Sequence, residues 1–600
     1  MTSWERLAAL EGGTVSWLAT AADGTRHAFA ATSVGVFRST DRGLSWSPLG
    51  GASRVAGVEV VAASPNYAED GIVFAGALGG LYRWREGGTA WEHLLSGSRV
   101  LSIAVTPGDP SAPADGSGLT VLAGTETDGV LISRDGGRSW DGANAGLLDL
   151  EILALAASPS FADDGLAFAA TPTTVYRTRN GAESWREIEL PSSGGDDVGA
   201  QCLALSAAFA EDGVILAGGL DRSLLRSEDR GRSWEEVADL AECDVFGISS
   251  LAGGRMVAAT DQGVGLSDDS GASWRLVGTD LEGVLSATTV EDGTQTVLLA
   301  GVADTGAARS DDGGETWATA NSGLTGAAFV GLLLSPDFER DQTVYAYGLQ
   351  AYFGISEDGG LSWMMRNDDI EEEIAVEELP GRGLVRASDP EAAWKKLVST
   401  FSQGEAVVVA IAPDAEERRD AGIYAVAVGH AKGVDRTPTL WRSVDRGRRW
   451  DRWLELPNVL GGTAIRVAAL PANRWGDTVV LGVGAEVMRP RPNAWENKGG
   501  ARRPVWDAAE LPGQDAAGRL PAVTGLAASP EYAQDRTLFA ATSAGVYVSR
   551  DGGASFSGWN DGLDPAATVA VALSPAYARD RLIYALGLGG TIWRRHDTAP

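Results

Sequence analysis

The chain has 600 residues, with 49 Lys and Arg against 81 Asp and Glu, which gives a formal net charge of −32. A single hydrophobic core rarely serves a chain of this length, so we expect several domains or a repeat architecture. The charge repels phosphate backbones and anionic lipids, so we expect neither nucleic acid nor a membrane surface as a partner. A basic protein, a cation or a neutral ligand is compatible with it.

The rarer residue types suggest no metal or cofactor site. Cys202 and Cys243 lie in neither a CxxC motif nor a Cys/His cluster, and we expect both to be small buried hydrophobic residues. Only four residues are Lys, which we interpret as a codon-usage bias. The N-terminal stretch MTSWERLAALEGG lacks a basic region followed by an apolar one. We therefore expect a cytoplasmic protein without a cofactor.

Short strands separated by turns recur along the chain. The segment 58–84 indicates a strand, a turn, a second strand, a glycine turn and a third strand, and 153–178 and 526–549 repeat this design. An S-P-x-[YF]-x-x-D turn joins the first two strands, with its aromatic residue at Tyr67, Phe161, Phe338, Tyr532 and Tyr577. Such a unit predicts a four-stranded antiparallel sheet, which must stack on others to bury both faces.

An eight-residue box, S-x-D-x-G-x-[ST]-[WF], follows the third strand of most units. Starts are mostly 40–49 residues apart, in the range of propeller repeats. Seven copies fit the pattern, two are near copies and two are worn copies; they begin at Ser39, Ser133, Ser227, Ser267, Ser310, Ser356 and Ser549, at Thr178 and Ser443, and at Trp84 and Met488.

We interpret the box as a structural turn between the third and fourth strands. Its Asp can accept hydrogen bonds from its own turn, its Gly can take a positive φ, and its Trp can pack between blades. No box has the EF-hand calcium pattern, so no metal site is predicted. The structural aspartates are Asp41, Asp135, Asp229, Asp269, Asp312, Asp358, Asp445 and Asp551.

The two ends of the chain predict one shared blade. Residues 2–9 resemble the tail of a box followed by a fourth strand, whereas 568–595 supplies three strands and stops. Pairing them removes an exposed sheet edge and gives about twelve blades. Two propellers are favoured over one large ring, and both stay open. We place blades 1–8 in 1–363, an acidic and helical insertion in 364–404, and blades 9–12 in 405–600, with a smaller insertion at 496–520.

These boxes resemble the Asp-box, or BNR, repeat of sialidases, two-propeller xyloglucanases, sortilin-type receptors and photosystem assembly factors. The resemblance covers nearly the whole chain and implies an all-β propeller fold. It implies no particular activity, because those relatives share the box and not a function.

Strand alternation divides a propeller into two faces. The boxes and S-P-x-[YF] turns share one face, and the two–three turns and four–one connections share the other, which we call the non-box face. Both insertions are expected in four–one connections, on the non-box face. In the first, the acidic stretch 367–380 precedes a predicted helix at 388–401 that contains Trp394; it either packs on its own propeller or docks a partner.

Acidic residues also recur at the tips of two–three turns. Asp221, Asp261 and Asp304 lie six residues before successive boxes, and Asp128 lies one residue from the equivalent position. They are either ordinary turn residues or an anionic rim for a basic peptide or a divalent cation. A longer tip at 429–439 adds further candidate binding residues, His430, Lys432 and Arg436, with Asp435 beside them.

Two classes of function follow. We expect a non-catalytic scaffold that binds a protein or peptide, including a basic one, through the non-box face. The alternative is a glycoside hydrolase that uses carboxylates in a cleft on that face. The sialidase F/Y-R-I-P signature is absent, and the four histidines, His27, His93, His430 and His596, are scattered. No catalytic residue is nominated, and the oligomeric state is not predicted.

Overall fold

The computed structural model describes residues 3–598 with internal gaps. The gaps are 8–9, 22–25, 51–54, 89, 109–112, 114, 192–198, 221, 292–295, 326–328, 336–337, 349–352, 367–403, 412–422, 430–438, 444–450, 456–464, 471–478, 499–500, 515–519, 564–567 and 588–589. Trp394, His430, Lys432, Asp435, Arg436, Asp445 and Asp221 lie outside the described residues, as does the predicted helix at 388–401.

The described strands form twelve four-stranded antiparallel sheets, each joined in the order first, second, third and fourth strand. This is the all-β propeller architecture predicted from the repeat. The chain divides into two compact units, Glu11–Ala328 and a second that joins Met1–Leu10 to Phe329–Pro600. The prediction of two propellers rather than one large ring is therefore confirmed.

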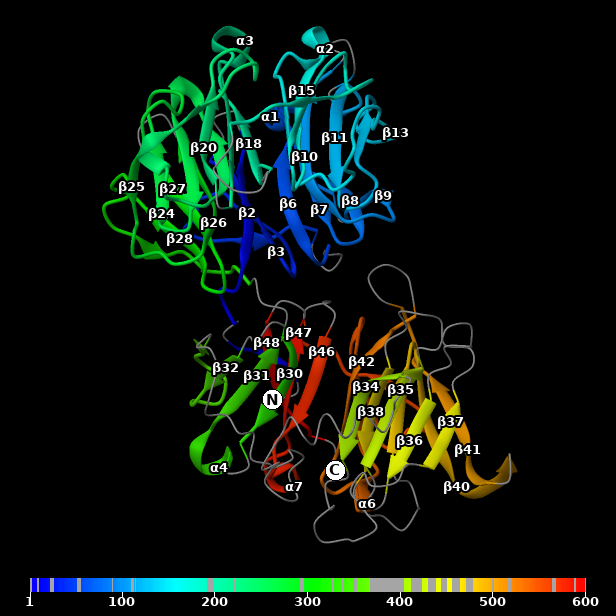
Figure 1. The fold of residues 1–600 in the computed structure, drawn as a ribbon. Coiled ribbons are helices and arrows are strands. Elements are labelled where there is room, and N and C mark those ends of the chain that lie inside the picture. The colour runs from blue at the N-terminus through cyan, green and yellow to red at the C-terminus, as the bar shows by residue number, and fades with distance from the viewer. Residues whose placement is uncertain are drawn as a thin grey trace. The chain divides into compact units, whose positions relative to one another are not determined.

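Residues 11–328 form a seven-bladed unit (Figure 1). Its blades, numbered in chain order, are blade 1 (β2 Val15–Thr20, β3 Ala28–Thr32, β4 Gly35–Ser39, β5 Ser47–Pro48), blade 2 (β6 Val58–Ala63, β7 Ile72–Ala77, β8 Gly80–Arg85, β9 Glu92–Ser96), blade 3 (β10 Val100–Pro107, β11 Leu119–Thr125, β12 Val130–Ser133, β13 Asp141–Gly142), blade 4 (β14 Ala154–Ala157, β15 Leu166–Ala170, β16 Val175–Arg179, β17 Arg186–Ile188), blade 5 (β18 Cys202–Leu205, β19 Ile215–Gly219, β20 Arg222–Ser227, β21 Glu235–Glu236), blade 6 (β22 Val245–Ser250, β23 Met256–Thr260, β24 Gly263–Ser267, β25 Arg275–Val277) and blade 7 (β26 Val284–Glu291, β27 Thr296–Val302, β28 Gly306–Ser310, β29 Ala318–Thr319).

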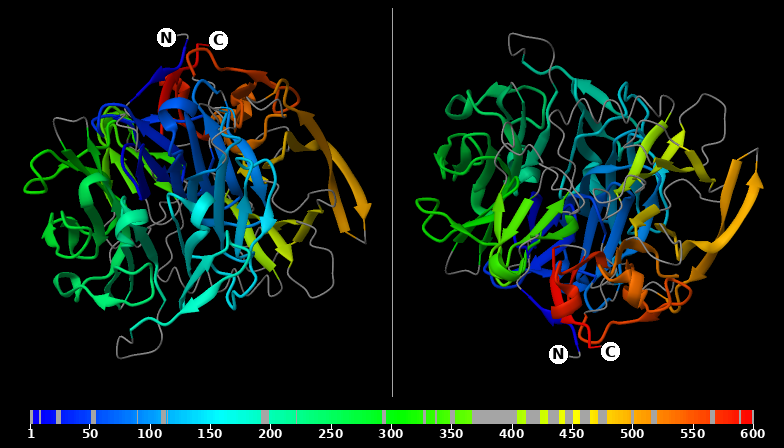
Figure 2. Two further views of the ribbon diagram at one scale, coloured as in Figure 1. Left: turned by 90° about the horizontal axis from the view of Figure 1, so that it is seen from above. Right: turned by 90° about the horizontal axis from the view of Figure 1, so that it is seen from below.

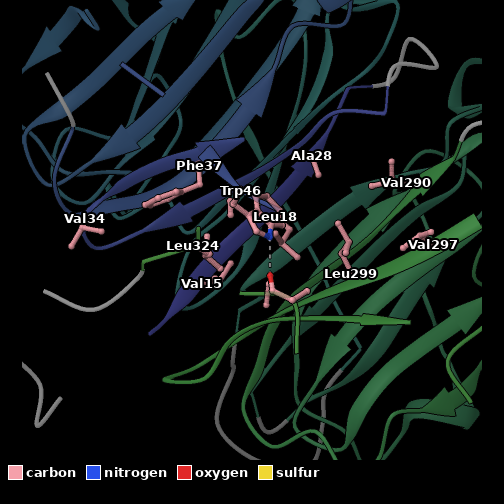
Figure 3. Close-up of a cluster of buried hydrophobic side chains, with 13 residues drawn as sticks. Val15, Leu18, Ala28, Val34, Phe37, Trp46, Val290, Val297, Leu299 and Leu324 are labelled. Atoms are coloured by element: carbon pink, nitrogen blue, oxygen red, sulfur yellow. Dashed lines mark hydrogen bonds between the residues drawn. The ribbon is translucent and has the colours of Figure 1, made fainter. Parts of the chain in front are cut away.

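The seven-bladed unit closes on itself because β2 packs against β6 on one side and β26 on the other. A buried cluster from blades 1 and 7 fills the closing interface, where Leu18 and Phe37 meet Leu299 and Leu324 (Figure 3). The indole of Trp46 lies in this cluster and donates a 2.9 Å hydrogen bond to the carbonyl of Ala320. The closing interface is therefore an ordinary apolar blade contact with one buried polar anchor.

The second unit contains five blades within the described residues. They are blade 8 (β30 Phe329–Leu334, β31 Val344–Gly348, β32 Phe353–Ser356, β33 Met364–Arg366), blade 9 (β34 Gly404–Ile411, β35 Ile423–Gly429, β36 Thr439–Ser443, β37 Asp451–Glu455), blade 10 (β38 Ile465–Ala469, β39 Val479–Val483, β40 Glu486–Lys498, β41 Ala501–Glu510), blade 11 (β42 Val523–Ala528, β43 Leu538–Thr542, β44 Gly545–Ser549, β45 Ser557–Gly558) and blade 12 (β46 Thr568–Leu573, β47 Leu582–Gly587, β48 Ile592–His596, with β1 Glu5–Arg6). Their first strands pack in the order β30, β46, β42, β38 and β34.

Strand β1 completes blade 12, as the sequence predicts. Glu5 and Arg6 pair with Arg594 and Trp593 of β48, and Figure 2 shows the blue N-terminal strand beside the red C-terminal strands. Trp4 has the geometry of a box tryptophan, because its backbone N–H donates to the carbonyl of Asp561 at 2.7 Å. The N–H groups of Trp46 and Trp185 make the same bond to the preceding blade.

Seven described boxes share one hydrogen-bond pattern, seen in Asp41. Its Oδ1 accepts bonds from the Ser39 hydroxyl at 2.8 Å and the Ser45 N–H at 2.9 Å, and its Oδ2 accepts the Ser45 hydroxyl at 2.6 Å. The same three bonds occur at Asp135, Asp229, Asp269, Asp312, Asp358 and Asp551. Both carboxylate oxygens are thus used inside the turn.

Within the described residues, a single helical turn joins the first two strands in six blades. In α1 (Tyr67–Asp70), the Asp70 carboxylate accepts the Ser64 hydroxyl at 2.6 Å and the Ile72 N–H at 2.9 Å. The equivalent turns are α2 Phe161–Asp164, α3 Phe209–Asp212, α4 Phe338–Asp341, α6 Tyr532–Asp535 and α7 Tyr577–Asp580. Among the described residues there are also two 3-10 turns, η1 Ala238–Leu240 and η2 Ala252–Gly254.

Arginines link every pair of neighbouring blades in the seven-bladed unit. Arg309, for example, donates from Nε to the carbonyl of Arg42 in the next box at 2.9 Å while its terminal nitrogens bond Asp311 in its own blade. A guanidinium presents several donors in one plane and can hold both partners, whereas an ammonium is a point charge. The other six contacts are Arg38 to Glu86, Arg83 to Gly136, Arg134 to Gly181, Arg177 to Arg230, Arg226 to Ser270 and Arg275 to Gly313. These arginines have a structural role that codon usage alone does not explain.

Two predictions for blade 10 are wrong: the worn box at Met488 does not form a box turn, and the insertion predicted at 496–520 does not begin in a four–one connection. Met488 lies inside β40, which pairs with β41 from Glu486↔Glu510 to Lys498↔Ala501. Residues 496–510 therefore belong to a long three–four hairpin and not to a four–one connection on the non-box face. Figure 2 shows the two orange strands extending at the edge of their unit. The 13-residue strand continues where a box would turn, because box Ser and Asp are missing.

We predict that Trp4→Ala destabilises the second unit alone. The substitution removes a buried indole, its edge-to-face contact with Trp559 and its hydrogen bond to the Trp559 carbonyl, which together should cost about 3–5 kcal/mol. Trp46→Ala is the matched change in the seven-bladed unit. Differential scanning calorimetry should show each variant lowering a different transition, and a common shift in both would contradict the assignment.

We predict that Asp312→Asn lowers stability near neutral pH and that this loss fades in acid. Hydrogen bonds from the hydroxyl and N–H of Thr316 and from Ser310 lower the pKa of Asp312 to about 2. A carboxylate with a lowered folded-state pKa stabilises the fold above its unfolded pKa of about 4 and loses that contribution as pH falls toward the folded value. Urea titrations at pH 7, 4 and 2.5 should show the gap to wild type narrowing.

The control for that experiment is Glu315→Gln, an exposed carboxylate in the same box. A gap between Asp312→Asn and wild type that stays constant with pH would show that the ionised carboxylate is not the stabilising group.

Candidate functional site

The non-box face of the seven-bladed unit is assembled by backbone bonds between two–three turns and four–one connections. The N–H of Leu78 donates to the carbonyl of Gly57, that of Glu126 to Arg99, and that of Ala303 to Gly283. At the opposite end the helical turns bond the boxes, as Gly181 does with Gly165. The two faces are therefore separated as strand alternation predicts.

The described part of this face is strongly acidic. Among the described residues of the turns and connections on this face, Arg99 is the only basic one. The described carboxylates there, or at the start of the adjoining first strand, are Glu11, Glu59, Glu126, Asp128, Asp149, Glu151, Glu189, Asp239, Glu242, Asp244, Asp261, Asp280, Glu282 and Asp304. A surface with this balance attracts cationic ligands and repels anionic ones.

The candidate tip aspartates are hydrogen-bonded within the turns. Asp128 bonds the Ser98 hydroxyl. Asp261 accepts the Asp244 N–H at 2.9 Å. Asp304 bonds the Thr14 hydroxyl at 3.3 Å, and its N–H donates to that hydroxyl at 3.1 Å. Each carboxylate ties a two–three turn to a four–one connection, and all three side chains stay exposed.

These aspartates are distributed around the ring. Asp261 and Asp304 lie on neighbouring blades 6 and 7, whereas Asp128 lies on blade 3. Within the described residues, no group of three or more His, Cys, Asp or Glu side chains is arranged to hold a metal ion. The tips therefore contribute charge to the face as separate groups.

A second repeated motif, missed in the sequence, fixes three of the two–three turns. Asn321 accepts the Ala307 N–H at 2.8 Å and donates to the Thr305 carbonyl at 2.7 Å. Asn144 and Asn560 make the same pair of bonds. Each stands four residues after the last residue of a box, in the pattern [WF]-x-x-x-N-x-G-L. Aligning the boxes over four further residues would have found it.

One sector of the non-box face also exposes apolar side chains. Leu78 at the blade 2 tip is 59% exposed, and Leu148 and Leu150, between blades 3 and 4, are 86% and 41% exposed. Gly57 leaves room for Leu78, since a Cβ at residue 57 would lie 2.6 Å from Leu78 Cδ1. The carbonyl of Leu150 accepts the N–H of Gly129, beside the blade 3 tip, at 3.0 Å.

Carboxylates of blades 2 and 3 lie in the same sector as these leucines, and Arg99 joins two of them. Arg99 pairs with Glu59 at 2.8 Å and with Glu126 at 3.2 Å, which joins blade 2 to blade 3. Burial lowers the pKa of Arg99, but its bonds to the two glutamates outweigh this and hold the pKa above its ordinary value. We call the exposed leucines Leu78, Leu148 and Leu150 with Glu59, Glu126 and Asp128 the leucine–carboxylate sector.

The second unit has a cavity of about 470 Å³ among its first strands. Its lining is apolar apart from Arg466 and Thr524, and the Arg466 side chain donates to the Thr524 carbonyl at 2.6 Å. Acid–base hydrolysis of a glycoside needs two carboxyl groups, and no carboxylate lines this cavity in the described residues.

Solved structures resemble this fold over its whole length. A GH74 xyloglucanase from Xanthomonas campestris matches with a TM-score of 0.54 at 15% identity, covering 99% of this chain and 100% of its own. A GH74 enzyme from Niastella koreensis matches with a TM-score of 0.53 at 12% identity, covering 100% of both chains. The sequence matches no protein-family model and no curated protein.

These likenesses and the twelve blades define a β-propeller protein. Among the described residues, no helix is long and apolar enough to cross a membrane.

Proposed function

We propose that this chain is a non-catalytic Asp-box propeller scaffold whose seven-bladed unit binds a basic, amphipathic segment of a partner protein. The carrying observation is the leucine–carboxylate sector, where three exposed leucines lie on a face whose described turns and connections contain many more carboxylates than basic residues. The repeated hydrogen bonds of the described boxes support the Asp-box assignment. A cytoplasmic location belongs to the same proposal.

Apolar exposure and charge favour the same kind of partner. Burial of exposed leucines supplies binding free energy, and apolar side chains that gather within a polar rim are typical of an interaction site. The acidic surroundings speed the approach of a cationic segment and disfavour anionic ones. An amphipathic segment that alternates apolar and basic residues satisfies both requirements.

We predict that Leu148→Ser with Leu150→Ser weakens binding of such a segment about tenfold or more. Losing two partly desolvated leucine contacts should cost about 1.5–3 kcal/mol. The probe is a synthetic amphipathic helix of Leu and Lys, measured by fluorescence anisotropy at 0.15 M NaCl. Leu44→Ser, which changes a 55% exposed leucine in a box, is the matched control.

The same peptide with Glu in place of Lys should not bind. Equal binding of both peptides, or undiminished binding to the double variant, would contradict the proposed interface. Affinity for the Lys peptide should fall as NaCl rises, because exposed charges are screened.

The second candidate function is glycoside hydrolysis, which is favoured by the whole-length likeness to the Xanthomonas xyloglucanase. Such an enzyme needs one carboxyl group as acid and another as base or nucleophile. If the chain is a hydrolase, purified protein should release reducing ends from xyloglucan in proportion to enzyme and time. A rate equal to that of buffer alone would remove this candidate.

A further inference from the structure

The box of blade 2 departs from the pattern at its first, third and seventh positions, the last of which is Ala90 in place of Ser or Thr. It reads WREGGTAW from Trp84, so Trp replaces the first Ser and Glu86 stands where other boxes have Asp. The N–H of Glu86 donates to the carbonyl of Gly71 at 2.8 Å. Its side chain instead bonds Arg38 from blade 1 and, at 3.3 Å, the hydroxyl of Tyr67 in α1. Unlike Asp41 in its box, the Glu86 carboxylate therefore bonds residues outside its own turn.

Blade 12 contains the same rearrangement and provides an internal comparison. Asp597 occupies the third box position there, and its N–H bonds the Arg581 carbonyl at 2.7 Å. Arg550 of blade 11 donates to both of its oxygens at 2.6 Å, and Tyr577 donates to one of them. The Asp597 side chain is 1% exposed. In blade 12 the displaced carboxylate is thus fully used by the protein.

Glu86 in blade 2 is only half used. Both of its side-chain bonds fall on Oε2, and within the described residues Oε1 accepts none. The side chain is 53% exposed. One oxygen of a carboxylate that is already held in place by Arg38 and Tyr67 therefore remains available to a ligand.

A cavity of about 460 Å³ lies beside Glu86. It is lined by His27, Tyr67, Ala68, Glu69, Asp70, Gly71, Arg85 and Glu86. The volume falls in the range of small-molecule sites. The blade 1 connection AADGTRH (21–27) lacks the S-P-x-[YF]-x-x-D motif found in five other blades, and its residues 22–25 lie outside the described part of the chain.

The groups in the cavity favour a positive charge. Arg85 bonds the carbonyl of Asp115 in the next blade, so its charge is directed to that contact. Asp70 has both oxygens engaged by Ser64 and Ile72, whereas Glu69 is exposed at the rim. The rings of His27 and Tyr67 meet edge-on, with centroids 5.5 Å apart. Aromatic walls beside carboxylates suit an organic cation.

We propose that this cavity binds an organic cation, an ammonium or guanidinium group on a short aliphatic stem, with the charged head at Glu86 Oε1 and the stem against Tyr67 and His27. The source is either a free amine or a basic side chain of a peptide. The site lies on the box side and does not depend on the leucine–carboxylate sector.

The test is isothermal titration calorimetry of the full chain with cadaverine at 0.15 M NaCl. We expect saturable binding of cadaverine and none of 1-pentanol, the neutral analogue. Glu86→Gln should weaken binding at least tenfold by removing the charge. Ala68→Phe, a change at an exposed position of α1, should abolish binding by filling the cavity without altering any charged group.

Glu211→Gln is the matched control, because Glu211 holds in α3 the position that Glu69 holds in α1. Tighter binding of Nα-acetyl-lysine methylamide than of cadaverine would assign the site to peptide side chains, and the reverse to free amines. The proposal fails if neither probe saturates the wild-type protein. It also fails if both Glu86→Gln and Ala68→Phe bind cadaverine like wild type, since binding would then be diffuse attraction to an acidic surface.

Discussion

Burial of blade faces against neighbouring blades is the constraint on which this structure depends. A four-stranded sheet has two faces, and the second strand of a blade is fully buried here, as the patterns of β3, β7 and β15 show. Neither face can be left in water, so each blade requires a neighbour on both sides. The seven-bladed unit meets this requirement by closing β26 onto β2, and blade 12 meets it by borrowing β1.

Polar contacts then fix how the blades meet. The box holds its Asp within the turn, the Asn motif ties the turn at the other end, and arginines extend from each blade of the seven-bladed unit to the next box. These contacts occupy the same positions in blade after blade. Side chains at repeated positions are used in structural contacts. Side chains become available to bind a ligand or partner where the repeat pattern is broken.

Two such breaks carry the functional inferences. Between blades 3 and 4 the connection exposes Leu148 and Leu150 among carboxylates. In blade 2 the worn box has Glu86 in place of Asp, the Glu86 carboxylate bonds Arg38 and Tyr67, and a cavity lies beside it. The sequence pattern predicts a specific site only on the non-box face, because the boxes are interpreted as structural turns. The departure at Trp84 was visible in the sequence, but its consequence depended on which neighbour the carboxylate reached.

The sequence by itself determined the blade. Alternating apolar residues, turn residues and a box every 40–49 positions specify a four-stranded sheet, and the incomplete units at the two ends specify their pairing. These are local patterns, and local sterics and hydrogen bonding decide them. Only the tertiary structure decided the grouping into two units, the extension of β40 and β41 into a hairpin, and the different environments of Glu86 and Asp597. Each of these depends on contacts between residues distant in the chain, where the competing arrangements satisfy the same local pattern and differ only in what packs against what.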